Sequence, residues 1–131
     1  MNRPLVRYML VCLSALMLAT GSVANADTPS PDVEDKLDQL IDALAHGDHG
    51  DFISGGNEAF RSNLRQAMFE NVQEHLGVRM AEGVERTFLA SLQQYGMTVY
   101  VWKLTFEDGE DELITRLAVD GNGDVGGIWF H

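Results

Sequence analysis

Apolar side chains recur along this chain first at helical spacing and later at strand spacing. After Pro31 they mark one face of a helix that is predicted to end at Gly47, and this face consists of Val33, Leu37, Leu40, Ile41 and Leu44. Ser30 is a suitable N-cap for it, and Pro31 suits its first turn. A second helix is predicted from a cap at Asn57 to Gly77, with a face made of Phe60, Leu64, Ala67, Met68, Val72 and Leu76. Residues 46–51 are predicted to connect the two helices, with Phe52 and Ile53 packed into the core beneath.

From Gly83 onward the hydrophobic period is two, as in β-strands. Strands are predicted over residues 84–93, 98–106, 112–119 and 125–131. Glycine-containing turns separate them, at residues 94–96, 107–110 and 120–124. Helices followed by a run of strands predict an α+β fold with two N-terminal helices packed on a four-stranded antiparallel meander sheet.

The first 26 residues have the features of a secretory signal peptide. Arg3 and Arg7 give a positive start, residues 5–19 are almost entirely apolar, and residues 24–26 (Ala-Asn-Ala) have the form of a cleavage site. The alternative is an uncleaved membrane anchor, but the apolar run is shorter than the roughly 20 residues that span a bilayer. We therefore expect export to the periplasm or medium, no stable membrane anchor after cleavage, a short tether over residues 27–31 and a single domain over residues 32–131.

Removal of this leader changes the composition of the domain. Cys12, the one cysteine of the chain, goes with it, so the remaining domain has neither a disulfide nor a thiol nucleophile. Arg3 and Arg7 go as well, which leaves seven basic against 20 acidic residues and takes the formal net charge from −11 to −13. A surface of that charge repels nucleic acid and anionic lipid headgroups. We expect no nucleic-acid partner, and solubility is the simpler explanation of the charge.

Several short motifs, taken in order, resemble the nuclear transport factor 2-like superfamily, the cone-shaped α+β fold shared with ketosteroid isomerases. They are Gly47-Asp48 and Phe52 between the helices, Gly83, residues 100–104 (Tyr-Val-Trp-Lys-Leu), Asp108-Gly109, and residues 125–128 (Val-Gly-Gly-Ile). They are spread over nearly the whole chain after the leader. The resemblance implies a curved sheet whose concave face meets the helices, and it implies the fold more than any one activity, because enzymes, binding modules and assembly domains share this fold.

The implied cone would hold a pocket between the sheet and the helices. Candidates to line it are Tyr100, Trp102, Leu104 and Phe106, which share one strand face, together with Phe88 and Phe60. The Tyr100 hydroxyl would be its polar group. The alternative is that these side chains fill the core and leave no cavity. If the domain self-associates through the opposite strand faces, Val99, Val101 and Ile128 would be buried between protomers.

The acidic residues do not form a catalytic pattern. An isomerase on this fold needs a dry, inward-facing carboxylate with a tuned pKa. The carboxylates collect instead at solvated strand ends and turns, namely Glu107, Asp108, Glu110, Asp111, Asp120 and Asp124. Glu85 and Glu112 alternate with the large apolar residues of their own strands. We therefore expect no catalytic residues and no cofactor.

Two segments contain groups that bind metals in other proteins. His46, Asp48, His49 and Asp51 could supply ligands to Zn²⁺ or Cu²⁺, but we favour a polar turn whose aspartates cap helices. Residues 120–124 resemble the start of an EF-hand loop. Position six is Val125 rather than glycine and position twelve is His131 rather than glutamate, so a hairpin turn is expected there.

These observations favour an exported, non-catalytic domain that binds a small apolar ligand or a protein partner through a sheet–helix pocket, as a monomer or a homodimer. Two alternatives stay open: an isomerase- or hydrolase-type enzyme of the same fold, and a self-associating structural domain.

Overall fold

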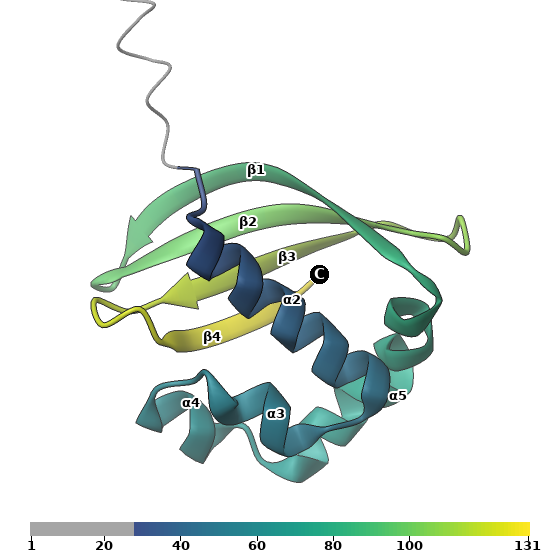
Figure 1. The fold of residues 1–131 in the computed structure, drawn as a ribbon, viewed down its shortest axis with the longest axis horizontal. Helices are drawn as coiled ribbons and strands as arrows, with labels where there is room; N and C mark the ends of the chain where they lie inside the picture. Colours follow the sequence, from purple (N-terminus) through teal and green to yellow (C-terminus); the bar gives the residue numbers. More distant parts are fainter. Residues whose placement is uncertain (1–27) are drawn as a thin grey trace, which may run out of the picture.

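The computed structural model describes residues 28–131, which form helices followed by one sheet (Figure 1). The predicted signal peptide, residues 1–26, lies outside the described residues. The elements are α2 (Pro31–His46), α3 (His49–Ser54), α4 (Glu58–Asn63), α5 (Gln66–Glu82), β1 (Val84–Gln94), β2 (Met97–Phe106), β3 (Leu113–Val119) and β4 (Val125–Phe130). The α+β class and the antiparallel sheet are confirmed, while four helices stand where two were predicted.

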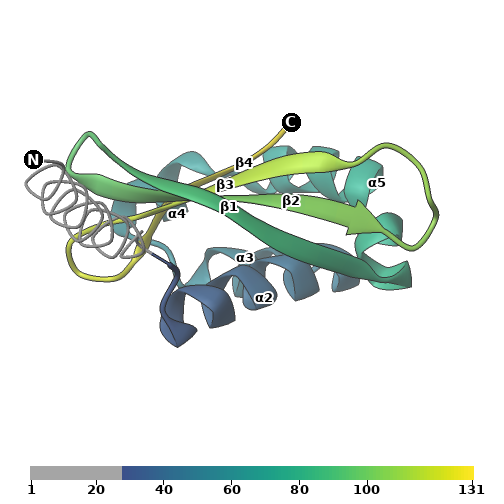
Figure 2. The same cartoon turned by 90° about the horizontal axis from the view of Figure 1, so that it is seen from above.

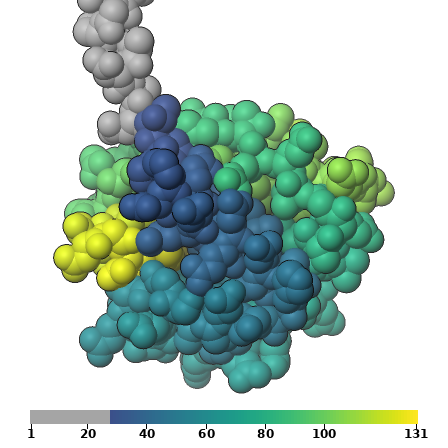
Figure 3. Space-filling model, in the orientation of Figure 1, coloured from purple at the N-terminus to yellow at the C-terminus, as the bar shows by residue number. Residues whose placement is uncertain are grey.

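Helix α2 begins and ends where its capping residues predict. The Ser30 hydroxyl accepts a hydrogen bond from the Val33 N–H, and the Gly47 N–H donates to the Ala43 carbonyl at the other end. The predicted apolar face is buried. Figure 1 shows α2 crossing one face of the sheet, and the space-filling view in Figure 3 shows its side chains covering the middle of that face. The burial of this face joins α2 to a core that also contains buried side chains of the sheet.

The predicted connection over residues 46–51 is shorter in the structure. His46 belongs to α2, and α3 begins at His49 because Asp48 caps it by accepting a hydrogen bond from the Asp51 N–H at 3.0 Å. Phe52 on α3 is buried, as predicted. Its ring packs against those of Phe60 and Phe69, with centroids 6.1 and 5.1 Å away.

The prediction of one continuous helix after Asn57 is wrong, because the chain leaves the helical conformation at Leu64 and is extended at Arg65. Asn57 does form a cap, but it caps the short helix α4. The break is stabilised by His49, whose Nε2 lies 2.9 Å from the Leu64 carbonyl oxygen. Helices α4 and α5 can therefore take different directions.

Gly77 was predicted to end this helix, and that prediction is also wrong, since α5 continues to Glu82. Gly77 is buried where α5 packs against α2. A Cβ atom at this position would lie 3.0 Å from the Leu44 carbonyl oxygen of α2. The residue allows a close approach of two helices.

The sheet is an antiparallel meander in the order β1-β2-β3-β4, so β1 and β4 form its edges. Strand β1 carries a bulge at Leu89, between the pairs Phe88–Trp102 and Ala90–Val101. Seen from above, α2 and α3 lie on one side of the sheet (Figure 2). Helix α4 lies beyond the β4 edge, and α5 runs from there to the start of β1 (Figure 1).

Arginine side chains tie the helices to the sheet at two points. Arg86 of β1 donates to Glu34 at 2.7 Å and to Asp38, both on α2. Arg79 of α5 donates to Asp108 at 2.7 Å, and its guanidinium lies 3.9 Å from the centroid of the Phe106 ring. The hydrogen bond from Arg79 lowers the pKa of Asp108. Both pairs are partly exposed, so they orient the elements more than they stabilise them.

The β1–β2 turn provides a test of backbone strain. Tyr95 and Gly96 both have positive φ, at 53° and 75°, as a two-residue type I′ turn requires. The left-handed conformation costs most residues about 1 to 2 kcal/mol but is tolerated by asparagine. Tyr95 is 92 % exposed, so its replacement sacrifices little packing. We expect Tyr95→Asn to raise the free energy of unfolding by about 0.5 to 1 kcal/mol in urea titrations.

Tyr95→Phe is the matched control for this prediction, because it keeps the strain and removes only an exposed hydroxyl. Equal stability of the Asn and Phe variants would show that the turn conformation carries no cost.

Candidate functional site

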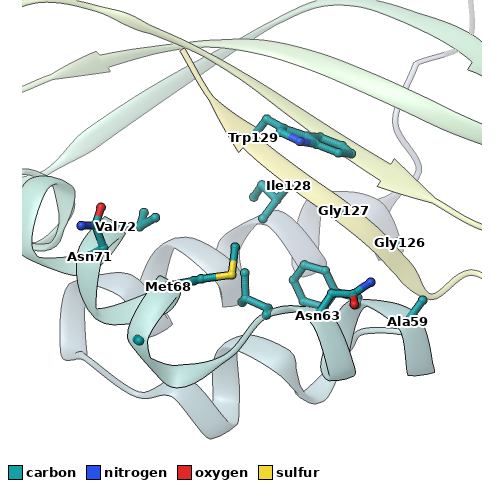
Figure 4. Close-up of a pocket in the computed structure, with 12 residues that line it drawn as sticks. Ala59, Asn63, Met68, Asn71, Val72, Gly126, Gly127, Ile128 and Trp129 are labelled. Carbon is teal, nitrogen blue, oxygen red and sulfur yellow. The ribbon is translucent and has the colours of Figure 1, made fainter.

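A groove of about 680 Å³ lies between strand β4 and helices α4 and α5 (Figure 4). Twelve residues line it: Ala59, Phe60, Asn63, Leu64, Ala67, Met68, Asn71, Val72, Gly126, Gly127, Ile128 and Trp129. None of these side chains is ionisable, and the polar side-chain atoms among them belong to Asn63, Asn71 and Trp129. The groove is therefore a neutral, largely apolar surface on an acidic protein.

The helical wall of the groove follows from helical spacing. Met68 and Val72 lie one turn apart on α5 and so project from the same face. In Figure 4, Ile128 of β4 points toward them from the opposite wall. Met68 is 50 % exposed although it is a large apolar side chain. The arrangement leaves apolar surface accessible along the groove.

Trp129 forms the rim of the groove on the strand side. A Cβ atom at Gly127 would lie 2.4 Å from the Trp129 indole, so the ring lies across the position where a side chain would stand. The Arg116 guanidinium lies 5.4 Å from the centroid of the Trp129 ring, and Arg116 Nη2 lies 3.0 Å from His131 Nε2. Trp129 is 43 % exposed. Gly127 thus determines where the indole lies.

The hydrogen-bonded side chains of Asn57 and Asp120 lie near two residues of the groove, Phe60 and Gly126. The Asn57 side chain accepts a hydrogen bond from the Phe60 N–H at 2.9 Å and donates one to Asp120 at 3.1 Å. The same carboxylate accepts hydrogen bonds from the backbone N–H groups of Asp124 and Asn122 in the β3–β4 turn. These bonds, led by that from Asp124, lower the pKa of Asp120. One carboxylate therefore links the start of α4 to the turn that precedes β4.

The pocket candidates named from the sequence lie mostly elsewhere. Phe60 lines the groove. Trp102, Leu104 and Phe106 are buried in the core under α2, and Tyr100 and Phe88 pack against Trp102 with ring centroids 6.0 and 5.9 Å away. The aromatic strand face therefore fills the core.

Sequence reasoning missed the contribution of β4 to the site. It expected Ile128 on the sheet face away from the helices, together with Val99 and Val101. Ile128 pairs with the buried Leu117 and lines the groove on the helix side. The sequence feature that could have indicated this contribution of β4 is the Gly126-Gly127 pair, since glycine within a strand often marks a close approach of another group.

The four residues considered as metal ligands contact helix backbone or a neighbouring amide. His46 Nδ1 lies 2.7 Å from the Asp42 carbonyl oxygen, His49 contacts the Leu64 carbonyl, and Asp48 caps α3. Asp51 accepts a hydrogen bond from the Gln39 side chain. Across residues 28–131, no group of three or more His, Cys, Asp or Glu side chains is placed to hold a metal ion. These contacts match the helix-capping interpretation of the segment.

No protein-family model matches the chain, and no curated protein matches its sequence. Among the described helices, none combines the length and the apolar character needed to cross a membrane.

The position of Trp129 can be tested through Gly127. We expect Gly127→Ala to displace the indole toward solvent, to increase acrylamide quenching of tryptophan fluorescence, and to cost about 1 to 3 kcal/mol of stability through overpacking. Trp102 is 1 % exposed and should contribute a constant, poorly quenched background. Gly121→Ala is the control, because nothing lies within 4 Å of a Cβ built there. Unchanged quenching in the Gly127 variant would contradict the packing described.

The link through Asp120 predicts a dependence of stability on pH. Its pKa is lowered in the folded state, so its contribution is present above the ordinary aspartate value of about 3.9 and is lost as the pH falls through the lowered value. We expect the free energy of unfolding of Asp120→Asn to fall less steeply below about pH 4 than that of the wild type. Urea titrations between neutral and acid pH measure this.

Asn57→Ala, which removes one donor to the same carboxylate, should reduce the acid sensitivity by a smaller amount. Parallel curves for the wild type and Asp120→Asn over the whole pH range would exclude this role of Asp120.

Proposed function

We propose that this protein is a non-catalytic binding domain whose groove between β4 and helices α4 and α5 accepts an uncharged apolar ligand. The observation that carries the proposal is the lining of the groove: none of its twelve residues carries a charge, and most of its side chains are apolar. Sites for small ligands typically measure about 300 to 1,000 Å³ and combine apolar walls with a few polar groups. The volume of about 680 Å³ and the amides of Asn63 and Asn71 fit that description.

The charge distribution supports a neutral ligand. The chain carries a formal net charge of −11, whereas the groove itself contributes no charge. An acidic ligand would be repelled by the surrounding field and would find no cation in the groove. A basic ligand would lack a carboxylate partner inside it.

Three carboxylates have lowered pKa values, which do not suit general acid–base catalysis near neutral pH. A general acid or base works best when its pKa lies near the working pH. Hydrogen bonds lower the pKa values of Asp108 and Asp120. The pKa of Glu112 is lowered first by the hydrogen bond from the Thr105 hydroxyl and then by the charge of Lys103. This direction favours structural carboxylates, and the groove contains no titratable side chain.

Two further assignments belong to this proposal. The antiparallel meander with a helix laid across one face supports a relation to the nuclear transport factor 2-like cone, and the sequence of residues 1–26 supports export.

Self-association through the outer sheet face has less support, because Val99 and Ala118 on that face are already buried within the protomer.

Binding of an uncharged fluorescent dye, N-phenyl-1-naphthylamine, tests the proposed function. We expect the wild-type protein to enhance its fluorescence saturably, and Met68→Glu to weaken binding about tenfold or more, because a carboxylate in the groove must lose water when the dye enters. The control is Val78→Glu, which introduces the same charge on α5 at a side chain that is 67 % exposed and does not line the groove. No saturable enhancement by the wild type, or equal weakening by both variants, would refute the proposal.

A further inference from the structure

The free edge of β4 carries backbone groups that point away from the sheet. Ile114 and His131 exchange both of their backbone hydrogen bonds, at 2.9 and 2.8 Å. Hydrogen-bonded and non-hydrogen-bonded pairs alternate along an antiparallel ladder. The pairs of Phe130 with Thr115 and of Ile128 with Leu117 are therefore non-hydrogen-bonded. The N–H and C=O groups of Ile128 and Phe130 face outward, away from β3.

The first residue of this edge is already paired by the protein's own chain. Val125 forms a parallel bridge with Gly56, in which the Asn57 N–H donates to the Val125 carbonyl at 2.8 Å and the Val125 N–H donates to the Gly55 carbonyl at 3.0 Å. The chain then turns into α4. Within residues 28–131, no other segment pairs with this edge after Val125. Residues 126–130 therefore keep an open strand position about 16 Å long, at roughly 3.3 Å per residue.

The groove lies beside this open position. A strand added to β4 would run about 4.8 Å from it. Its side chains would alternate between the two faces, and those on one face would meet Met68 and Val72 of α5 (Figure 4). Helix α4 and the first turns of α5 lie beside the same edge (Figure 1), so the broad sheet of a second copy would have to pass them to reach β4. The space therefore suits one extended segment.

The outward N–H and C=O groups of β4 favour a peptide over other apolar ligands. A small apolar molecule in the groove would cover the outward N–H and C=O of Ile128 without bonding to them, and an unsatisfied buried polar group is costly. An extended peptide supplies both partners while its side chains fill the groove. The neutral lining selects uncharged side chains on the face that points inward.

We infer that the occupant of this groove is an extended, uncharged segment of a partner protein that adds to β4 as a fifth strand. The inference rests on the proposed function, for which it names the partner. Recognition combines backbone hydrogen bonds to Ile128 and Phe130 with apolar side chains packed against α5.

The experiment uses the peptide acetyl-Ser-Val-Ser-Val-Ser-Val-Ser-amide as an uncharged, alternating probe, with affinity measured by calorimetry and amide protection by hydrogen-exchange NMR. We expect saturable binding that slows exchange of the Ile128 and Phe130 amides. Ile128→Pro removes the outward N–H at a position where proline leaves the ladder intact. Ile128→Ala, the matched control, loses the side chain but keeps the N–H. The Pro variant should bind at least tenfold more weakly than the Ala variant.

The following results would contradict strand addition by a partner peptide. Binding of the dye without binding of the peptide leaves the proposed function standing and removes the peptide partner, whereas binding of neither removes both. Equal affinities of the Pro and Ala variants would mean that the peptide does not pair with β4. Protection of Ile128 without peptide would indicate a second copy if it rises with protein concentration, and residues 1–27 if it does not.

If circular dichroism shows that Ile128→Pro does not fold, the wild type is tested with the same peptide N-methylated at every residue. Loss of its N–H donors should weaken binding at least tenfold, and equal binding would exclude strand addition.

Discussion

The contact between the apolar face of α2 and the aromatic face of β2 is the interaction on which the rest of the structure depends. The described residues contain no cysteine, so burial of side chains such as Leu37, Leu44, Trp102 and Leu104 holds the helices to the sheet. Each such side chain contributes about 1.5 to 3 kcal/mol when fully buried. Trp102 takes part through packing alone, because its indole N–H has no hydrogen-bond partner among the described residues. These side chains fill the space under α2, and the groove lies instead where the helices leave the sheet, at β4.

The break between α4 and α5 gives that groove its shape. If the chain had continued as one helix past Leu64, the groove-lining side chains between residues 60 and 72 would all stand on one straight helix. The change of direction at Leu64 and Arg65 places Phe60 and Met68 on two short walls that face β4. His49 makes the break tolerable by contacting the Leu64 carbonyl. A residue considered from the sequence as a metal ligand thus helps to form the site through a backbone contact.

Sequence patterns within a few residues predicted the helices and strands well. The features that these patterns missed depend on contacts between residues far apart in the chain. The caps and face of α2, the turns and the antiparallel strands follow from residues within a few positions of one another. The break at Leu64 has no glycine or proline to mark it, and its stabilising partner, His49, lies 15 residues away. The aromatic residues of β2 were expected to line a pocket because the alternation of apolar and polar residues shows which side chains share a strand face. That alternation does not show how completely a helix fills the space opposite this face. The groove combines residues near 60–72 with residues 126–129, so it depended on the strand order that puts β4 at the edge.

The hydrogen bond between Asn57 and Asp120 also shows which distant parts of the chain must dock before the groove exists. The two residues are 63 positions apart, and the bond joins the helical half of the chain to its last hairpin. Contacts between distant segments pay the largest loop-closure entropy and tend to limit the folding rate. The helices and the β1–β2 hairpin can form from local contacts, whereas the groove exists only after the final strand has docked. The binding surface therefore needs residues from both halves of the described chain, and binding competence requires that the helices and the last strand are docked together.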